Sequence, residues 1–338
     1  MSSRVTVKDI AKELDISIGT VSKALSGKNG ISEEMRNNVA NKAKEMGYSV
    51  NRIAQSLSRR QIKLGIVYPS VWSHYYNEIV DGMVRAIERL RDNNVHGEFW
   101  QFSGLYSLHE LTAAVDKAIE AQPDAIVLCP GSISEMGDCA NRIREHGIKL
   151  ILVGNDMDGA KRLCSVRLNA FMAGAMAAEF MGYLTGNDAS LAVFIGDKGH
   201  REHMEKVSAF ENQLEEGRIL VRVFETQDEP DVAALFTRKL ISDLPEIGGI
   251  YVATGNSVAV CATLAKLGKT NVPVIATDLF DNIMPYIQSR MIRGIIYQNP
   301  GQQGEKAIEV CYRYLVSRVD PDSDIFISPS LLLRSNIL

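Results

Sequence analysis

From Leu64 onward, short apolar segments alternate with amphipathic helical patterns at a spacing of roughly 30 residues. This alternation is typical of parallel α/β sheets, in which each strand is followed by a helix that returns the chain to the same edge. Nine such segments fit two doubly wound lobes better than one sheet. The predicted strands contain KLGIVYP, GEFWQF, DAIVLCP, KLILVGN, SLAVFIGD, ILVRVFE, GGIYVATG, PVIATD and RGIIYQN.

The length and composition of the chain agree with more than one soluble domain. The chain has 338 residues, which exceeds what one compact core usually holds and predicts two or three domains. No apolar run reaches the length of a membrane span, and the N-terminal MSSRVTVKDIAKEL lacks the apolar run of a secretory signal. The five cysteines show no CxxC spacing, which is typical of reduced, mostly buried thiols. We therefore expect a cytoplasmic protein.

The charge of the chain is unevenly distributed. Residues 1–63 contain twelve Lys and Arg against six Asp and Glu, a net charge of +6. Residues 64–338 contain 25 basic and 35 acidic residues, a net charge of −10. A small basic head on a larger acidic body indicates that the head binds a polyanion.

Three short amphipathic helices are predicted in this head, within residues 1–48. The first spans Thr6 to Leu14, the second begins after the capping residue Ser17, and the third runs from the cap Ser32 to Gly47. A helix, a tight turn and a second helix braced by a third form the helix-turn-helix arrangement of DNA-binding proteins. The inward-facing residues are Val7, Ile10, Ala11, Leu14, Val21, Ala24, Leu25, Met35, Val39, Ala43 and Met46.

The start of the second helix carries the residues that suit contact with DNA. Ser17, Thr20 and Ser22 are small and can donate hydrogen bonds to phosphate oxygens. Lys23 lies one turn further along and can reach a guanine edge in the major groove. The alternative is a small helical cap with a serine-rich turn and no ligand.

The head resembles that of the lactose-repressor (LacI/GalR) family of bacterial transcription regulators. The resemblance rests on VTVKDIAKELDISIGTVSKALSG, on ISEEMRNNVANKAKEMGY and on SVNRIAQSLSRR. It implies that residues 49–63 form a hinge helix and linker, with Leu57 as an apolar wedge between base steps and Ala54 beside it in the minor groove. Ile53 would pack the two hinges of a dimer together. Thr6 and Asn51 complete the predicted DNA contacts.

Three positions of the head depart from the pattern of that family. Family members commonly have proline where this chain has Val50. The first two base-reading positions are Ile18 and Gly19, of which the first offers only apolar contact and the second offers no side chain. Lys23 therefore carries most of the expected direct readout.

Polar and aromatic residues follow the predicted strands of the body, where ligands of parallel α/β proteins bind. Aromatic faces with carboxylates and amides are the groups that bind a polyhydroxyl ligand. Each residue taken alone is also explained as a helix cap or a loop residue. The candidate effector-binding residues are Ser70, Trp72, His74, Tyr75, Tyr76, Asn155, Asp156, Arg201, His203, Lys206, Asn256, Asp278 and Gln298.

The body is similar to the periplasmic sugar-binding-protein fold that forms the effector domain of the LacI/GalR family. The similarity implies an N-lobe of about residues 64–168 plus 299–326 and a C-lobe of about 169–296 plus the C-terminal segment. It assigns Asp278 to the carboxylate that binds hydroxyls. Gly255-Asn256 stands where many members have Asn-Asp. Arg201, His203 and Lys206 all compete for the position of the arginine that is usual after the strand SLAVFIGD.

The sequence thus predicts a homodimeric, cytoplasmic transcription regulator, most simply a repressor, that binds operator DNA and a carbohydrate-like effector. The alternative is a solute-binding protein of a sugar transport system, which would share the body but need no basic head. No positioned acid and base and no cofactor motif is present, so we expect no enzymatic activity and no cofactor. His200 and His203 lack a third ligand at a suitable spacing, which predicts no metal site.

Overall fold

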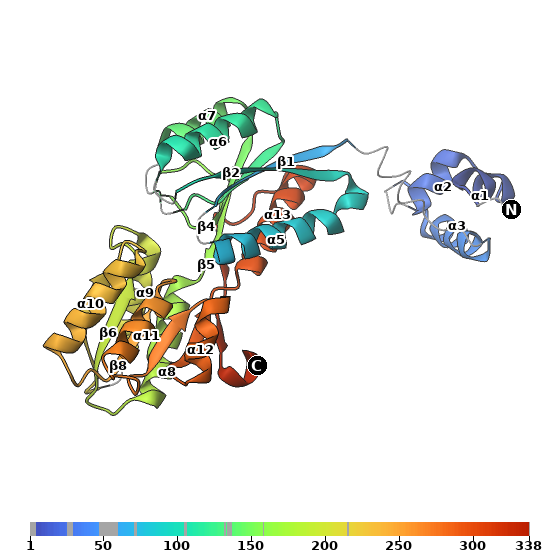
Figure 1. Cartoon of the computed structure of the whole chain (residues 1–338). Helices are drawn as coiled ribbons and strands as arrows, with labels where there is room; N and C mark the ends of the chain where they lie inside the picture. Colours follow the sequence, from blue (N-terminus) through green and yellow to red (C-terminus); the bar gives the residue numbers. More distant parts are fainter. Residues whose placement is uncertain are drawn as a thin grey trace. The chain divides into compact units, whose positions relative to one another are not determined.

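The computed structural model describes residues 5–25, 30–46, 60–70, 73–104, 107–131, 133, 137–157, 159–214 and 216–337. The chain divides into two compact units, Met1–Arg60 and Gln61–Leu338 (Figure 1). None of the helices in the described ranges is long and apolar enough to cross a membrane.

The first unit contains three helices around a small apolar core, as predicted: α1 (Val7–Glu13), α2 (Ile18–Leu25) and α3 (Glu33–Glu45). Ser17 Oγ accepts a hydrogen bond from Thr20 N at 3.0 Å, and Ser32 Oγ accepts one from Met35 N at 3.2 Å, which confirms both predicted caps. Thr6 donates through its backbone N to Asp9 at 2.8 Å. The core residues with the lowest exposure are Ile10, Ala11, Val21, Ala24, Val39 and Ala43.

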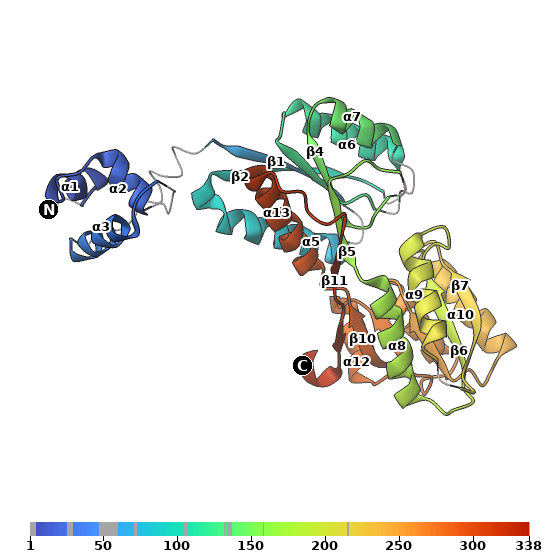
Figure 2. The same cartoon turned by 180° about the vertical axis from the view of Figure 1, so that it is seen from behind.

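The second unit contains two six-stranded sheets, each covered by helices on both faces, which confirms the two-lobed α/β prediction (Figures 1 and 2). In the first lobe the strand order is β11-β5-β4-β3-β1-β2, and all pairs are parallel. Helices α5 and α13 cover one face, and α6 and α7 cover the other (Figure 1). Its elements are β1 (Ile62–Pro69), α5 (Ser73–Arg89), a 3-10 turn (Arg91–Asn93), β2 (Val95–Phe102), α6 (Leu108–Glu120), β3 (Ala125–Leu128), α7 (Gly137–Glu145), β4 (Lys149–Gly154), β5 (Cys164–Leu168), α13 (Pro300–Ser317) and β11 (Asp324–Ile327).

In the second lobe the strand order is β12-β10-β9-β8-β6-β7, and only the β10–β12 pair is antiparallel. Helices α8 and α9 pack on one face of this sheet, and α10 and α11 pack on the other (Figure 1). Its elements are α8 (Ala170–Leu184), β6 (Ser190–Ile195), α9 (Arg201–Asn212), β7 (Ile219–Glu225), α10 (Pro230–Asp243), β8 (Gly249–Val252), α11 (Ser257–Lys266), β9 (Val274–Thr277), a 3-10 turn (Asp281–Ile283), α12 (Met284–Gln288), β10 (Ile292–Tyr297), β12 (Ser330–Leu332) and α14 (Arg334–Ile337).

The chain passes between the lobes after β5, after β10 and after β11. Hydrogen bonds connect these crossings to one another. Asn299 Nδ2 donates to Ser328 O at 2.7 Å and to Ser330 Oγ at 2.9 Å, and Asn169 N donates to Ile327 O at 2.9 Å. The crossings therefore form a shared hinge region, and a movement of one lobe acts on all of them.

All nine predicted strands are present, but the sequence did not predict β5, β11 or β12. These strands are short and contain polar residues, such as Arg167 in β5 and Asp324 in β11. β11 and β12 lie at the edges of the sheets and β5 lies between β11 and β4, so all three are stabilised by pairing with neighbouring strands, which no local apolar pattern reports. The five cysteines are free and buried, as predicted.

Candidate functional site

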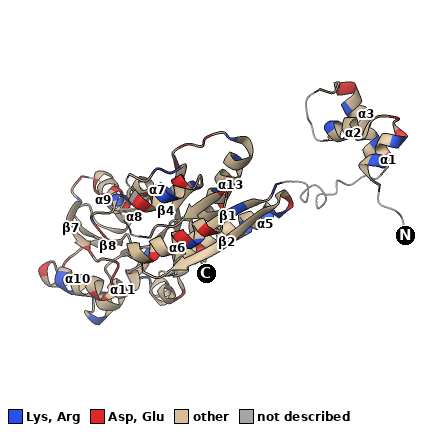
Figure 3. Ribbon diagram, turned by 90° about the horizontal axis from the view of Figure 1, so that it is seen from above, with Lys and Arg blue, Asp and Glu red and all other residues tan. Residues whose placement is uncertain are grey.

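The exposed surface of α2 is the first candidate site. Val21 and Ala24 are buried against the head core, which turns Ile18 and Lys23 outward; Ile18 is 49% exposed. An added Cβ at Gly19 would meet only Ser17 Oγ, at 3.6 Å, so a phosphate or base can approach the backbone closely here. Basic residues occur on all three head helices, whereas acidic residues occur on α1 and α3 and not on α2 (Figure 3). The predicted DNA-contact residues that the structure describes are Thr6, Ser17, Ile18, Gly19, Thr20, Ser22 and Lys23.

Residues 49–59 of the predicted hinge and linker lie outside the described residues, whereas Ile62 and Lys63 already belong to β1. The predicted contacts Asn51, Ile53, Ala54 and Leu57 are therefore not described, and neither is Trp72 of the predicted effector site. Their roles stay predictions.

The second candidate site is a cavity in the second unit, with a volume of about 100 Å³. The first lobe contributes residues from α5 and the residue after β4, and the second lobe contributes α9 and the ends of several strands. Eight of the predicted effector residues line it: His74, Tyr75, Tyr76, Asn155, His203, Lys206, Asp278 and Gln298. Four lining residues were not predicted as contacts: Asp228, Ala253, Thr254 and Gly255.

Asp278 is the best-positioned hydrogen-bonding group of the cavity. It follows β9 with a left-handed backbone (φ of 60°) and is 6% exposed. Its carboxylate accepts hydrogen bonds from Gln298 N at 3.0 Å and from Gln298 Nε2 at 2.5 Å, which fix its orientation. Burial raises the pKa of Asp278 to about 6, against the effect of these bonds.

Lys206 reaches the cavity from α9, and Gln298 connects it to Asp278. Lys206 Nζ donates to Gln298 Oε1 at 3.1 Å and to Ala253 O at 3.4 Å. Burial lowers the pKa of Lys206. Helix α9 approaches α8 closely because Gly174 has no side chain: an added Cβ there would lie 2.1 Å from Lys206 O.

His203 and Asp228 meet on the other side of the cavity. Asp197 N donates to His203 Nδ1 at 3.0 Å, and burial lowers the pKa of His203 to about 3, so the ring is neutral. An added Cβ at Gly196 would lie 2.7 Å from both His203 Cε1 and Asp228 Oδ1. Glycine at this position therefore leaves room for Asp228. The sequence signal that could have identified Asp228 is its position shortly after the predicted strand β7.

The helical periodicity of α9 separates the three residues that competed for one role. His203 and Lys206 are three positions apart and share the face toward the cavity. Arg201 instead donates from Nε to Glu205 Oε1 at 3.0 Å, and its side chain is 52% exposed. The structure thus places His203 and Lys206, and not Arg201, at the cavity.

Three other predicted effector residues lie outside the cavity lining. Ser70 is exposed after β1. Asp156 binds the guanidinium of Arg162 through both carboxylate oxygens, at 2.6 and 2.5 Å. Asn256 is 2% exposed and donates to Thr226 Oγ1 at 3.1 Å. Their proposed contact with an effector stays a prediction.

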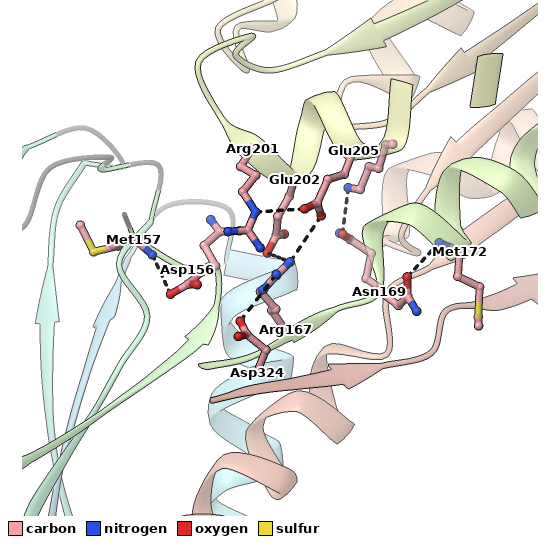
Figure 4. Close-up of polar contacts among 12 residues, drawn as sticks. Asp156, Met157, Arg167, Asn169, Met172, Arg201, Glu202, Glu205 and Asp324 are labelled. Atoms are coloured by element: carbon pink, nitrogen blue, oxygen red, sulfur yellow. Dashed lines mark hydrogen bonds and ion pairs between the residues drawn. The ribbon is translucent and has the colours of Figure 1, made fainter. Parts of the chain in front are cut away.

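A cluster of buried charges lies beside the cavity, around Arg167 of β5 (Figure 4). The Arg167 side chain is 1% exposed, and its Nη1 lies 3.6 Å from Glu202 Oε1 and 3.4 Å from Glu205 Oε2. Its Nη2 lies 3.7 Å from Asp324 Oδ1. Since β5 and β11 belong to the first lobe and α9 to the second, the pairs with Glu202 and Glu205 join the two lobes, whereas the pair with Asp324 lies within the first lobe.

Burial raises the pKa of Glu202 to about 7 from 4.5, and the attraction of Arg167 and Lys206 offsets this only in part. Between these two values the folded protein keeps a proton on Glu202 that the unfolded chain has released. The resulting stabilisation is complete below the unfolded pKa and is lost as the pH rises through the folded pKa.

We predict that the Glu202→Gln variant loses less of its free energy of unfolding than the wild type between about pH 5 and 8. Denaturant unfolding at each pH measures this free energy. Parallel plots of unfolding free energy against pH for the two proteins would contradict the prediction.

Comparisons with known proteins agree with this architecture. Residues 64–318 match the family model described as periplasmic binding protein domain, and residues 6–51 match the model described as bacterial regulatory proteins, lacI family. Catabolite control protein A of Staphylococcus epidermidis is 25% identical over 186 residues, which is 52% of each chain. The HTH-type transcriptional regulator pepR1 of Lactobacillus delbrueckii subsp. lactis is 25% identical over 195 residues, or 57% of this chain and 56% of the relative. The matches thus span about half the length of these curated relatives.

A solved structure reproduces the fold of the second unit. GanP, a glucose-galactose binding protein from Geobacillus stearothermophilus, aligns with a TM-score of 0.73 at 18% identity over 82% of this chain and 99% of that chain. The head with its capped helices, the two-lobed body and both family matches lead to one conclusion. The chain carries a head of the lacI family of bacterial regulatory proteins at residues 6–51 and belongs, over residues 64–318, to the periplasmic binding protein domain family.

Proposed function

We propose that the protein is a homodimeric, cytoplasmic repressor whose operator binding is controlled by a neutral sugar or polyol bound in the cavity at Asp278. The observation that carries the effector proposal is the orientation of this carboxylate by Gln298 within a cavity that Tyr75 and Tyr76 also line. A fixed carboxylate accepts hydrogen bonds from neighbouring hydroxyls, and aromatic rings pack on the C–H face of a sugar.

The charges of the cavity favour a neutral effector over a sugar phosphate. The lining contains the carboxylates Asp228 and Asp278 and the cation Lys206, which already donates to Gln298 and to Ala253. His203 is held neutral by its lowered pKa. A phosphate would meet more negative than positive charge here, which costs binding free energy.

The head favours operator DNA as the macromolecular partner. The face of α2 that carries Ile18 and Lys23 is exposed and the sequence of the head is basic. A twofold dimer would present two such helices to the half-sites of a palindrome. The solved relative GanP is named for binding glucose and galactose, which makes these hexoses the first effectors to screen.

We expect the affinity for DNA selected from a random-sequence library to fall steeply with salt. Each phosphate neutralised contributes about 0.9 to the slope of log K against log salt, so about four contacts weaken binding roughly tenfold per doubling of salt. Fluorescence anisotropy with labelled duplex measures the slope. An affinity that does not change with salt concentration, or failure to select any DNA, would overturn the proposed role of the head in DNA binding.

Lys23→Ala provides a matched test of base readout. We expect this variant to discriminate about tenfold less between selected and scrambled duplexes, because a lysine contact to a guanine edge is lost. Lys239→Ala removes the same side chain from α10 in the second unit and should leave discrimination unchanged. Equal effects of both variants would exclude a base-reading role for Lys23.

A further inference from the structure

A second, larger cavity adjoins the one at Asp278 and differs from it in chemistry. Its volume is about 690 Å³, and His74 and Gly255 line both cavities. The two cavities are therefore neighbouring compartments of the same site, and we refer to them as the inner and the outer cavity. The outer cavity is large enough for a substantial organic substituent.

The walls of the outer cavity are mainly apolar. Val258 and Ala259 of the first turn of α11 are half-buried on one side, and Phe280 after β9 and Pro230 of α10 complete the wall. The rings of His74 and Phe280 are in contact, with centroids 4.5 Å apart. His74 comes from the first lobe and Phe280 from the second, so this pair joins the lobes where the two cavities meet.

The polar groups of the outer cavity lie at its edges. Asp281 and Asn282 are exposed residues of the 3-10 turn after Phe280. Asn256 is buried, and its Oδ1 has no hydrogen-bond partner among the described residues. The inner cavity, in contrast, contains Asp228, Asp278, Lys206 and Gln298. A ligand that fills both cavities needs a polyhydroxyl part at one end and an apolar part at the other.

We infer that the outer cavity is a subsite for an apolar aryl or alkyl substituent, so that the effector is an amphiphilic glycoside and not a free sugar. This inference rests on the proposed function, because it takes the polyhydroxyl part to bind at Asp278. Covering Val258, Ala259 and Phe280 removes apolar surface from water, which stabilises the complex without any further hydrogen bond.

The test compares glycosides that differ only in the substituent, using the full-length protein. Methyl and phenyl β-D-glucopyranoside, the same pair of galactosides, and cellobiose are titrated by calorimetry. We expect one phenyl glycoside to bind roughly tenfold tighter than its methyl counterpart, since a phenyl ring buries far more apolar area than a methyl group. Cellobiose has a polar second sugar in place of the phenyl ring, and we expect it to bind no better than the methyl glucoside.

Two variants place this preference at the outer cavity. Ala259→Phe fills the cavity from α11 and should abolish the phenyl preference while retaining methyl glycoside binding. Leu267→Phe introduces the same ring at the exposed C-terminal end of that helix, where Leu267 is 42% exposed, and should keep the preference. Should Ala259→Phe not fold, Phe280→Ala removes an apolar wall and should reduce the preference instead.

The outcomes separate this inference from the proposed function. Equal binding of methyl and phenyl glycosides would overturn the apolar subsite and leave the proposed function standing. Tighter binding of cellobiose than of phenyl glucoside would also overturn it, in favour of a second sugar. A phenyl preference that survives Ala259→Phe would place the substituent elsewhere. Absence of binding by every glycoside would contradict both.

Discussion

Replacement of Arg167 by leucine is expected to lower the free energy of unfolding of the second unit by about 3–5 kcal/mol. The guanidinium is 1% exposed and pairs with Glu202, Glu205 and Asp324, and it also stacks 4.6 Å from the ring centroid of Phe326. Leucine leaves the carboxylate of Glu202, itself 6% exposed, buried without its cation. Without its cation this carboxylate either stays charged in the interior or takes up a proton that the unfolded chain has released at neutral pH, and both lower the free energy of unfolding.

Urea unfolding followed by tryptophan fluorescence measures this effect, because both tryptophans, Trp72 and Trp100, belong to the second unit. Arg201→Leu is the matched control: Arg201 also pairs with Glu205 but is 52% exposed, so its loss should cost less than about 1 kcal/mol. Adding Glu202→Leu to Arg167→Leu should recover part of the stability, since both ends of that pair are then apolar. Similar losses for Arg167→Leu and Arg201→Leu would contradict the buried-charge argument.

Asp278→Ala is expected to abolish stabilisation by the effector. A ligand at a hundred times its dissociation constant adds about 2.7 kcal/mol to the stability of the wild type. Hydrogen bonds to a charged group contribute roughly 1.5–3 kcal/mol each, so loss of an acceptor that binds two hydroxyls lowers affinity at least about a hundredfold. Thermal unfolding is measured with sugars, polyols and sugar phosphates. The effector should raise the unfolding midpoint of the wild type by a few degrees and leave that of Asp278→Ala unchanged.

Two further variants make the Asp278 result interpretable. Asparagine at position 278 tolerates the left-handed backbone but carries no charge. Asp278→Asn therefore distinguishes the effect of losing the charge from the effect of straining the backbone. Asp188→Ala makes the same change at an exposed residue outside the cavity lining and should leave the ligand response intact. If Asp188→Ala lost as much response as Asp278→Ala, or if only sugar phosphates stabilised the protein, a neutral sugar at Asp278 would be excluded.

Much of the candidate site followed from local pattern, because the carboxyl ends of parallel strands meet at one edge of a sheet. That rule identified Asn155, Asp278 and Gln298, which line the cavity. Asp228 and Thr254 also follow predicted strands, β7 and β8, but the sequence analysis did not select them as contacts. Asp228 reaches the cavity because Gly196, on a different strand end, leaves room for it.

The same rule selected Asp156, which the structure places in an ion pair with Arg162. Arg162 also donates from Nη1 to Ser323 O at 2.6 Å, so Asp156 helps to hold the segment before β11. A carboxylate at the end of a strand is the same sequence signal whether it binds a ligand or a neighbouring arginine. Only the position of Ser323, 161 residues from Arg162, distinguishes the two cases.

The sequence by itself determined the three head helices, their caps at Ser17 and Ser32, and nine strands of the body, because capping residues and apolar periodicity are local patterns that can be recognised without the tertiary fold. The tertiary structure alone decided that Arg167 lies in a strand at all. A buried arginine is stable only where carboxylates from Glu202 and Asp324 meet it, and these residues lie on separate elements far along the chain. The apolar outer cavity was decided in the same way, since α10, α11 and the segment after β9 form it only once the sheet is assembled.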